Sequence, residues 1–322
     1  MTEVLEIVTG LNIFPIKSCH AATVDGSPVG SLEVSATGFA AHDVRDREFV
    51  LFEADSSGDG SHLFLSQRGW GENGRLDRSH AGDNALATVH TDISERFVTV
   101  TSAIGELELL SRHVEEGERR RVRVHSSFLE GVLDQGPEAA KYFSELVGRS
   151  VRLGRSSRVQ QRMIGSTYQR ETAANTVAAA DAHPFLLVSE ASLAQSHIQN
   201  DLPLGTVSID QYRGNIVVAG DVAGAYDEDY WREIKISDVG FYVVKACARC
   251  PMPNVDQESG ERTVPGMKVL RGRDGYLEAG GKRDTFFGQN LNHRYRPGQH
   301  VAVGDRLTVI ERAAARNFVT AA

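Results

Sequence analysis

Short apolar runs separated by turn-forming residues dominate the first third of the chain. The runs are rich in Val, Ile, Leu and Phe, and clusters of Gly, Ser, Asp and Asn, such as 55–61, separate them. Their spacing is typical of an all-β barrel or sandwich. We predict no helix before residue 130, and strands over 4–16, 30–34, 47–53, 62–67, 85–89, 97–102 and 106–110.

The remainder of the chain mixes both kinds of element. Apolar residues at helical spacing predict helices over 136–146 and 189–199, and strand-like runs lie between and after them. Strands and helices do not alternate regularly, which argues against a doubly wound parallel sheet. We therefore expect a β-rich α+β protein, with an N-terminal β-barrel domain over 1–125 and a second barrel-like domain with a few helices over 126–322.

Composition narrows the class of protein. The chain is 41% hydrophobic and 24% charged, as in ordinary globular proteins. Its formal net charge of −8 disfavours non-specific binding to nucleic acid, which requires a basic surface. Acidic residues stand where a signal peptide has basic ones, and no run approaches the roughly 20 apolar residues of a membrane helix. We expect a cytoplasmic protein with reduced thiols and no membrane or nucleic-acid partner.

The densest chemical signal is Cys247-Ala248-Arg249-Cys250, which ends a buried-looking strand. Thiolates bind soft metals, and a neighbouring arginine favours the thiolate form. Three interpretations remain open from these residues alone. The pair could belong to a four-ligand zinc site, form a thioredoxin-like redox pair, or serve as two small core residues.

Cations and hydroxyls also recur at predicted strand ends. The segment 13–19, IFPIKSC, brings Lys17 and Ser18 after Pro15, and VRDRE at 44–48 brings Arg47. SQR at 66–68 and QYRGNI at 211–216 repeat the pattern. Each residue alone is typical of a surface ion pair, whereas several converging cations bind phosphate well. Cys19 is expected to be a buried core residue.

Taken together, these motifs resemble the MOSC family. IFPIKSC, VRDRE and SQR are similar to the β-barrel domain that precedes a MOSC domain. Four later motifs are similar to the MOSC domain itself, namely DAHPFLLVSEASL (181–193), QYRGNIVV (211–218), CARCPMPNVDQESG (247–260) and FFGQNL (286–291). The resemblance extends to mitochondrial amidoxime reducing components and to bacterial reductases of N-hydroxylated bases.

This resemblance implies two β-rich domains and a bound molybdenum cofactor, a pyranopterin dithiolene with a terminal phosphate. Cys250 matches the residue that ligates molybdenum, and Cys247 does not. Asp181-Ala182-His183 stands where the family commonly has Asp-Thr-Ser, so His183 replaces a hydroxyl donor. The further positions that match cofactor contacts are Lys17, Ser18, Arg47, Arg213 and Asn215.

Four more residues near these motifs are candidates for the site. Arg249 is expected to help neutralise the anionic cofactor, and Gln289 to donate a hydrogen bond to the pterin. Asn254 and Asp256 follow Cys250 within one short loop, which makes Asp256 a candidate proton donor or organiser of the metal site. A loop-capping role for Asp256, and a simple turn around Gln289, are the alternatives.

The resemblance implies a molybdenum-dependent reductase that removes the oxygen of a small N-hydroxylated substrate. The chain has no ferredoxin-like cysteine set, so electrons are expected from a separate haem or iron–sulfur protein. Three other functions remain open. They are a sulfur carrier with a persulfide on Cys250, a module that stores the cofactor, and a zinc-stabilised structural domain.

Overall fold

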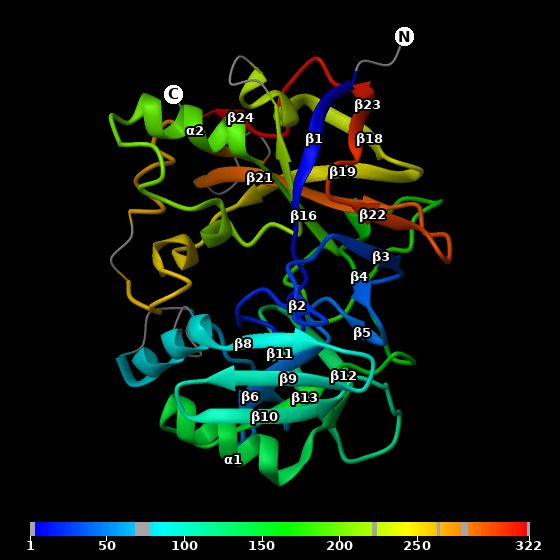
Figure 1. Cartoon of the computed structure of the whole chain (residues 1–322), viewed down its shortest axis with the longest axis vertical. Helices are drawn as coiled ribbons and strands as arrows, with labels where there is room; N and C mark the ends of the chain where they lie inside the picture. Colours follow the sequence, from blue (N-terminus) through cyan, green and yellow to red (C-terminus); the bar gives the residue numbers. More distant parts are fainter. Residues whose placement is uncertain (1–3, 68–77, 221–223, 263–264, 278–282, 321–322) are drawn as a thin grey trace.

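Two lobes joined at a waist make up the protein, which is described by a computed structural model (Figure 1). The structure describes residues 4–67, 78–220, 224–262, 265–277 and 283–320. The first described strand, β1 (Val4–Leu11), and the last, β24 (Val319–Thr320), both lie in the upper lobe. The chain therefore begins and finishes its described course in the same lobe and passes through the lower lobe in between.

The upper lobe is a closed seven-stranded barrel. Pairing of Phe185, Leu186 and Leu187 with residues 289–291 closes the ring. Its closure confirms the expected β-rich, barrel-like fold. In order around the ring, the strands are β16 (Phe185–Ser189), β17 (Ile216–Ala219), β1, β23 (Arg306–Arg312), β18 (Trp231–Ile236), β19 (Val239–Ala248) and β21 (Arg283–His293). A short strand, β20 (Asp274–Tyr276), extends the sheet from β21 to β24.

Strand β1 is the one barrel strand from the front of the chain. It pairs with β17, Leu11 opposite Ile216, and with β23, Ile7 opposite Arg306. The prediction of a strand over 4–16 was too long, because β1 ends at Leu11. The chain then leaves the barrel through Pro15 toward the lower lobe. The residues that follow β1 are consequently fixed at the waist between the lobes.

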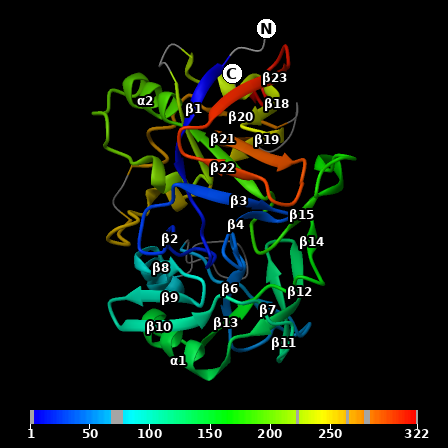
Figure 2. The same ribbon diagram turned by 45° about the vertical axis from the view of Figure 1, so that its right-hand side comes forward.

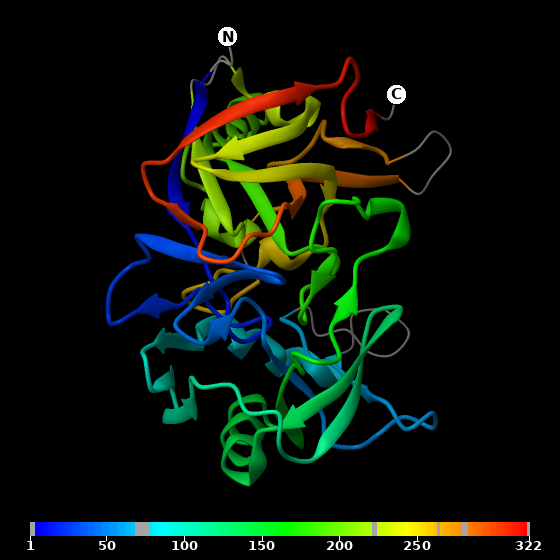
Figure 3. The same cartoon turned by 90° about the vertical axis from the view of Figure 1, so that its right-hand side faces the viewer.

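The lower lobe contains two sheets, seen below the barrel in Figure 3. One is five-stranded, with β6 (Phe49–Glu53), β13 (Val151–Arg155), β12 (Ser127–Asp134), β11 (Arg119–Val124) and β7 (His62–Leu63) in order. The other is four-stranded, with β10 (Gly105–Leu110), β9 (Phe97–Ser102), β8 (His90–Ile93) and β2 (Thr23–Val24).

Two smaller sheets lie at the waist. In Figure 2, β22 (His300–Ala302) lies beside β3 (Ser31–Ser35), and this sheet continues through β4 (Gly38–Ala41) to β5 (Val44–Arg45). A two-stranded ribbon pairs β14 (Arg162–Met163) with β15 (Thr176–Val177). Strand β22 comes from the end of the chain and β3 from its beginning, so this sheet ties the two halves of the sequence together.

The two predicted α-helices are confirmed. Helix α1 (Gly136–Val147) has Pro137 in its first turn and buries Ala139, Phe143 and Val147, which recur every four residues. Helix α2 (Glu190–Gln199) begins after Ser189, whose side chain accepts a hydrogen bond from the Ser192 backbone N–H. Among the described residues, no helix combines the length and the apolar character required to span a bilayer.

The prediction of a strand over 85–89 was wrong, as was the expectation of no helix before residue 130. These residues fall in and just after a 3₁₀ segment, η1 (Arg78–Thr88). Leu86 and Val89 are fully buried in the main core, as an apolar run requires. Short apolar runs do not distinguish a strand from tight helical turns, because burial alone satisfies both.

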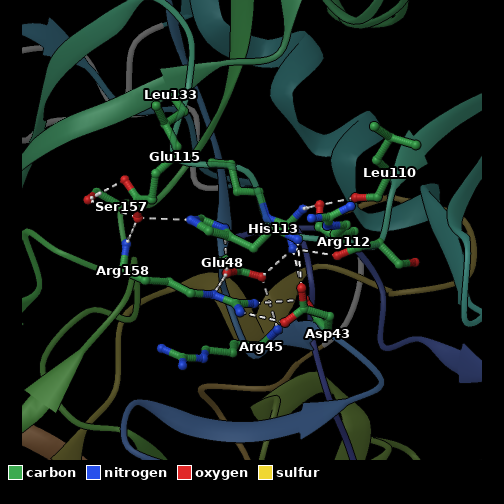
Figure 4. Close-up of polar contacts among 12 residues, drawn as sticks. Asp43, Arg45, Glu48, Leu110, Arg112, His113, Glu115, Leu133, Ser157 and Arg158 are labelled. Atoms are coloured by element: carbon green, nitrogen blue, oxygen red, sulfur yellow. Dashed lines mark hydrogen bonds and ion pairs between the residues drawn. The ribbon is translucent and has the colours of Figure 1, made fainter.

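A buried ion cluster around Glu48 fixes the segment 44–48 (Figure 4). Glu48 is 1% exposed, and its carboxylate accepts hydrogen bonds from Arg155 at 2.9 Å and from Arg158 at 2.8 Å. The ring of His113 lies 3.3 Å from the same carboxylate. Burial raises the pKa of Glu48, but His113, Arg155 and Arg158 outweigh it and lower the pKa to about 2. The cluster thereby anchors the backbone next to Arg47.

We expect Glu48→Gln to destabilise the fold by about 3 kcal/mol at pH 7, because it leaves two guanidinium groups near an uncharged amide. A carboxyl whose pKa is lowered contributes stability above pH 4.5 and loses it as the pH falls toward 2. Urea unfolding from pH 7 to pH 2.5 should therefore show the difference from wild type shrinking on acidification. The exposed Glu130→Gln is the control, with a change within about 0.5 kcal/mol. A difference independent of pH would contradict the assignment.

Candidate functional site

A cavity of about 210 Å³ opens at the waist between the lobes. Arg47, Asn290 and four longer stretches line it, namely 17–18, 180–186, 212–215 and 245–252. The first comes from the chain as it leaves β1, and the last from the end of β19 and the loop beyond it. The cavity therefore collects side chains that are more than 200 residues apart in the sequence.

Lys17 and Ser18 lie where the chain turns away from the barrel. Ser18 has the left-handed φ of 73°, and Lys17 is 5% exposed. The Lys17 ammonium group forms an ion pair with Asp181 and lies 5.2 Å from the centre of the Phe64 ring. The Asp181 side chain is half exposed and also lies 3.2 Å from His125. One carboxylate thus holds Lys17 at the rim of the cavity.

Arg47 and Arg213 contact one aromatic ring. Their guanidinium carbons lie 4.8 and 4.3 Å from the centre of the Phe14 ring. Both residues have left-handed φ values, 50° and 56°, which side chains other than glycine seldom adopt. Arg47 also donates hydrogen bonds to Asp46 and, at 3.1 Å, to Asn215 Oδ1. Backbone strain of this kind persists only where the surroundings enforce it, and it clusters at functional sites.

Arg213 is a cation removed from water. It is 6% exposed, and burial together with the charge of Arg47 lowers its pKa to about 9. Nη1 donates to Gln257 Oε1 at 3.0 Å, and Nη2 has no hydrogen-bond partner among the described residues. At neutral pH the group remains charged, because the pKa still lies above 7. An anion bound beside it would satisfy both the free N–H and the charge.

The two cysteines lie where β19 ends, with Cys247 on the strand and Cys250 in the loop 249–255 that follows it. Both are half-buried and line the cavity. Arg249 donates to the Tyr212 carbonyl at 2.9 Å, and its Nη1 lies 3.2 Å from Cys247 Sγ. This side chain fixes the loop between the two thiols and keeps a positive charge beside them.

A close backbone approach holds the loop after Cys250 in place. Asn254, in the short helix η6 (Met252–Asn254), accepts a hydrogen bond from the Met267 backbone N–H at 2.9 Å. A Cβ at Gly266 would lie 2.0 Å from the Pro253 carbonyl oxygen, so only glycine fits there. The loop that carries Cys250 is therefore clamped on the side away from the cavity.

The cavity brings together most of the residues that the sequence singled out. Its lining includes Cys250, Lys17, Ser18, Arg47, Asp181, His183, Arg213, Asn215 and Arg249. Part of this set is also structural, since Asn215 Oδ1 accepts from the Leu186 N–H. Arg68, in the SQR motif, lies outside the described residues.

Three predicted residues do not line the cavity. Asp256 Oδ1 accepts hydrogen bonds from the backbone N–H groups of Glu258 and Ser259, which is the loop-capping arrangement. Asn254 clamps its loop as described above. Gln289 is fully buried in β21, where it donates to Asp229 at 2.9 Å. In this structure all three hold the framework rather than face the cavity, and a role in the reaction stays a prediction.

Two of the alternative interpretations of the cysteines lose support. Within the described residues, no group of three or more His, Cys, Asp or Glu side chains is placed to hold a metal ion, as a zinc site requires. Cys247 and Cys250 line a cavity rather than a core. Cys19, in contrast, is fully buried, and burial raises the pKa of its thiol to about 12. It remains a neutral core residue.

Sequence reasoning missed several residues of the site. Phe14 lies inside the IFPIKSC motif, between an apolar run and Pro15. These neighbours in the sequence do not indicate its contacts with the guanidinium groups of Arg47 and Arg213. Gln257 joins Arg213 to Gln67 of the lower lobe, to which it donates a hydrogen bond at 3.2 Å. Lys245 lines the cavity two positions before Cys247 on β19. The alternation of a strand, which puts residues 245 and 247 on one face, was the available signal.

We expect Arg213→Leu to abolish anion binding without loss of stability. Its lowered pKa means that burial disfavours the charge, so the leucine variant should unfold in buffer at or above the wild-type temperature. Inorganic phosphate should raise the unfolding temperature of the wild type and of the exposed-surface control Arg296→Leu. It should have little effect on Arg213→Leu. Equal stabilisation of all three proteins would show that Arg213 does not bind the anion.

Comparison with known proteins agrees with this geometry. Two family models match the chain, the MOSC N-terminal beta barrel domain over residues 5–150 and the MOSC domain over residues 174–308. Mitochondrial amidoxime reducing component 2 is 26% identical over 257 residues in Bos taurus, covering 79% of this chain and 67% of that protein. The Homo sapiens protein of that name is 28% identical over 264 residues, covering 79% and 68%.

A second group of relatives is longer. Molybdenum cofactor sulfurase from Homo sapiens is 26% identical over 271 residues, covering 80% of this chain and 27% of that protein. The chain thus spans about two thirds of the amidoxime reducing components and about a quarter of the sulfurase. Both domain models match in order and together cover most of the chain. The protein belongs to the MOSC family and carries a MOSC domain preceded by a MOSC N-terminal β-barrel domain.

Proposed function

We propose that this protein binds a molybdenum cofactor in the waist cavity and reduces N-hydroxylated compounds. One observation carries the proposal. Cys250, which can ligate a soft metal, lines the same cavity as Lys17, Arg47 and Arg213, which can hold a phosphate. The names of the amidoxime reducing components and the molybdenum cofactor sulfurase support molybdenum and oxidoreductase chemistry.

The lining residues fit such a group. Several buried polar atoms at the cavity have no hydrogen-bond partner among the described residues, namely Arg213 Nη2, Arg249 Nε and both ring nitrogens of His183. Buried polar groups in native proteins are normally paired, so these atoms indicate a polar occupant. Five cations face the cavity and one carboxylate, Asp181, does so. The occupant is therefore expected to be an anion.

Each part of the cofactor has a matching set of residues. Lys17, Ser18, Arg47 and Arg213 would hold its terminal phosphate, because charge-assisted hydrogen bonds are strongest where water is excluded. Cys250 would ligate the molybdenum. When bound, the cofactor supplies two-electron oxygen-atom transfer, which with two protons converts an N–OH compound to the N–H compound and water.

The protein's own residues then position and tune this chemistry. Arg249 holds the thiol-bearing loop against the Tyr212 carbonyl and places a positive charge beside the cysteines. Asn254 and Gly266 keep the loop from shifting, so the Cys250 sulfur stays in one position. We propose that electrons arrive from a separate haem or iron–sulfur protein, because the three cysteines of this sequence, one of them in the core, do not supply the ligands of an iron–sulfur cluster.

A sulfur carrier is the second candidate function. The relatives named molybdenum cofactor sulfurase favour it, and a persulfide on Cys250 would occupy the same place. A carrier has no need to retain an anionic cofactor, whereas five cations line the cavity and two of them, Lys17 and Arg213, are buried. The cation set thus favours the reductase.

We expect Cys250→Ser to abolish reduction of benzamidoxime by chemically reduced protein while leaving the fold intact, because the phosphate contacts remain. Cys247→Ser is the matched control and should keep most of the activity. Circular dichroism verifies the fold, and elemental analysis should find about one molybdenum per chain in the wild type.

The outcomes separate the functions. Full activity in Cys250→Ser would exclude the metal-ligand role, and total loss in Cys247→Ser alone would assign the ligand to the other cysteine. Labile sulfur without molybdenum would support the carrier, and zinc that stabilises the fold would support a structural site.

A further inference from the structure

Lys245 is a cation of the cavity without an anionic partner. It lies on β19 beside Asn290 of β21 and is half-buried. Its ammonium group lies 4.6 Å from the centre of the Tyr168 ring. No carboxylate or hydrogen-bond acceptor pairs with it in the part of the chain that the structure describes. A cation held over an aromatic ring inside a cavity keeps its hydrogen-bonding capacity for an occupant.

The other lining cations are already engaged. Lys17 pairs with Asp181 and Arg47 with Asp46. Arg249 donates to a backbone carbonyl, and Arg213 to the side chain of Gln257. Lys245 thus differs from the other four in what it can offer to a ligand.

His183 lies beside Lys245 and is equally unsatisfied. It is 6% exposed, and its ring packs edge-on against Tyr168 at 5.3 Å. Within the part of the chain that the structure describes, neither ring nitrogen has a hydrogen-bond partner. Burial and the charges of Lys245 and Arg162 lower its pKa to about 3, so the ring is neutral at pH 7. A neutral imidazole offers one N–H donor and one acceptor. A buried donor and a buried acceptor without hydrogen bonds lower the stability of the fold, so these two nitrogens indicate a polar ligand group here.

These two residues form a subset of the lining distinct from the proposed phosphate contacts. Lys245 and His183 both pack against the Tyr168 ring, whereas Arg47 and Arg213 both pack against the Phe14 ring. Lys245 lies two positions before Cys247 on β19, and both line the cavity, so Lys245 is on the side where this strand delivers the cysteines. A group bound by Lys245 and His183 therefore lies on the cysteine side, where a substrate has to approach.

We propose that Lys245 and His183 form an anion subsite that selects N-hydroxylated substrates bearing a carboxylate. This inference rests on the function proposed above. A carboxylate presents two acceptor oxygens, one for the Lys245 ammonium group and one for the His183 N–H. The same positive charge disfavours cationic substrates such as protonated N-hydroxyguanidines, because like charges repel strongly where water is excluded. Tyr168 holds Lys245 in position from behind.

The test uses a pair of inert probes that differ only in the carboxylate. Calorimetry measures binding of 4-carboxybenzamide and of benzamide to the molybdenum-loaded protein. The wild type should bind the carboxylated probe at least about tenfold more tightly, as expected for one charge-assisted hydrogen bond. Lys245→Met should remove this preference, whereas Lys245→Arg and the exposed-lysine control Lys235→Met should retain it. Equal affinity for the probes in the wild type, or an unchanged preference in Lys245→Met, overturns the proposal.

Two further readouts separate the possible failures. Molybdenum content of Lys245→Met should equal that of the wild type, and its loss would assign Lys245 to the cofactor and overturn the subsite. With 4-carboxybenzamidoxime and benzamidoxime as substrates, Lys245→Met should raise KM for the first at least about tenfold and leave kcat for both nearly unchanged. A protein that discriminates between the inert probes but reduces neither substrate retains the subsite and loses the proposed function. A protein that reduces both with equal kcat/KM retains the function and loses the subsite.

Discussion

The burial of positive charge at the junction of two lobes is the constraint on which the rest of this structure depends. Arg47 and Arg213 both contact the Phe14 ring, and both side chains are largely shielded from water. Asp46 balances the charge of Arg47, whereas Arg213 donates to the neutral Gln257, and burial together with the charge of Arg47 lowers the pKa of Arg213. The left-handed backbone at both arginines shows that the fold enforces their positions. Under the proposed function, a negatively charged ligand would offset the cost of burying the Arg213 charge.

Contacts on both sides fix the positions of these two arginines. On one side, the Glu48 cluster fixes the segment that carries Arg47 with two arginines and a histidine. On the other, Gln257 joins Arg213 to Gln67, so that a side-chain ladder crosses between the lobes. The hydrophobic core runs through both lobes as one cluster, from Val8 and Ile13 to Phe143 and Leu307. Relative movement of the lobes is therefore resisted by apolar packing as well as by polar contacts.

The sequence predicted those features whose causes are local. Ser189 and Pro137 marked the starts of both α-helices, and the CARC segment marked the loop at the end of β19. The sequence-based prediction was wrong where tertiary packing determines the secondary structure. The apolar run around Leu86 became 3₁₀ turns because burial, not period, was its requirement. The structure buries Gln289 in β21 against Asp229, and a contact of its amide with the cofactor stays a prediction. Lys245 was not predicted, although strand alternation puts it on the same face of β19 as Cys247.

The position of β1 has a consequence for how the molecule can be divided. Along the chain, the first barrel strand is β1 and the second is β16, and residues 12–184 lie between them. The boundary between the two family domains is therefore not a boundary between independent folding units. A fragment starting after residue 125 would lack β1 and leave the facing edges of β17 and β23 unpaired. Open strand edges recruit other chains, so such a fragment would self-associate rather than behave as an isolated barrel. The lobe that bears Lys17 and Arg47 is for the same reason tethered at both ends to the barrel it serves.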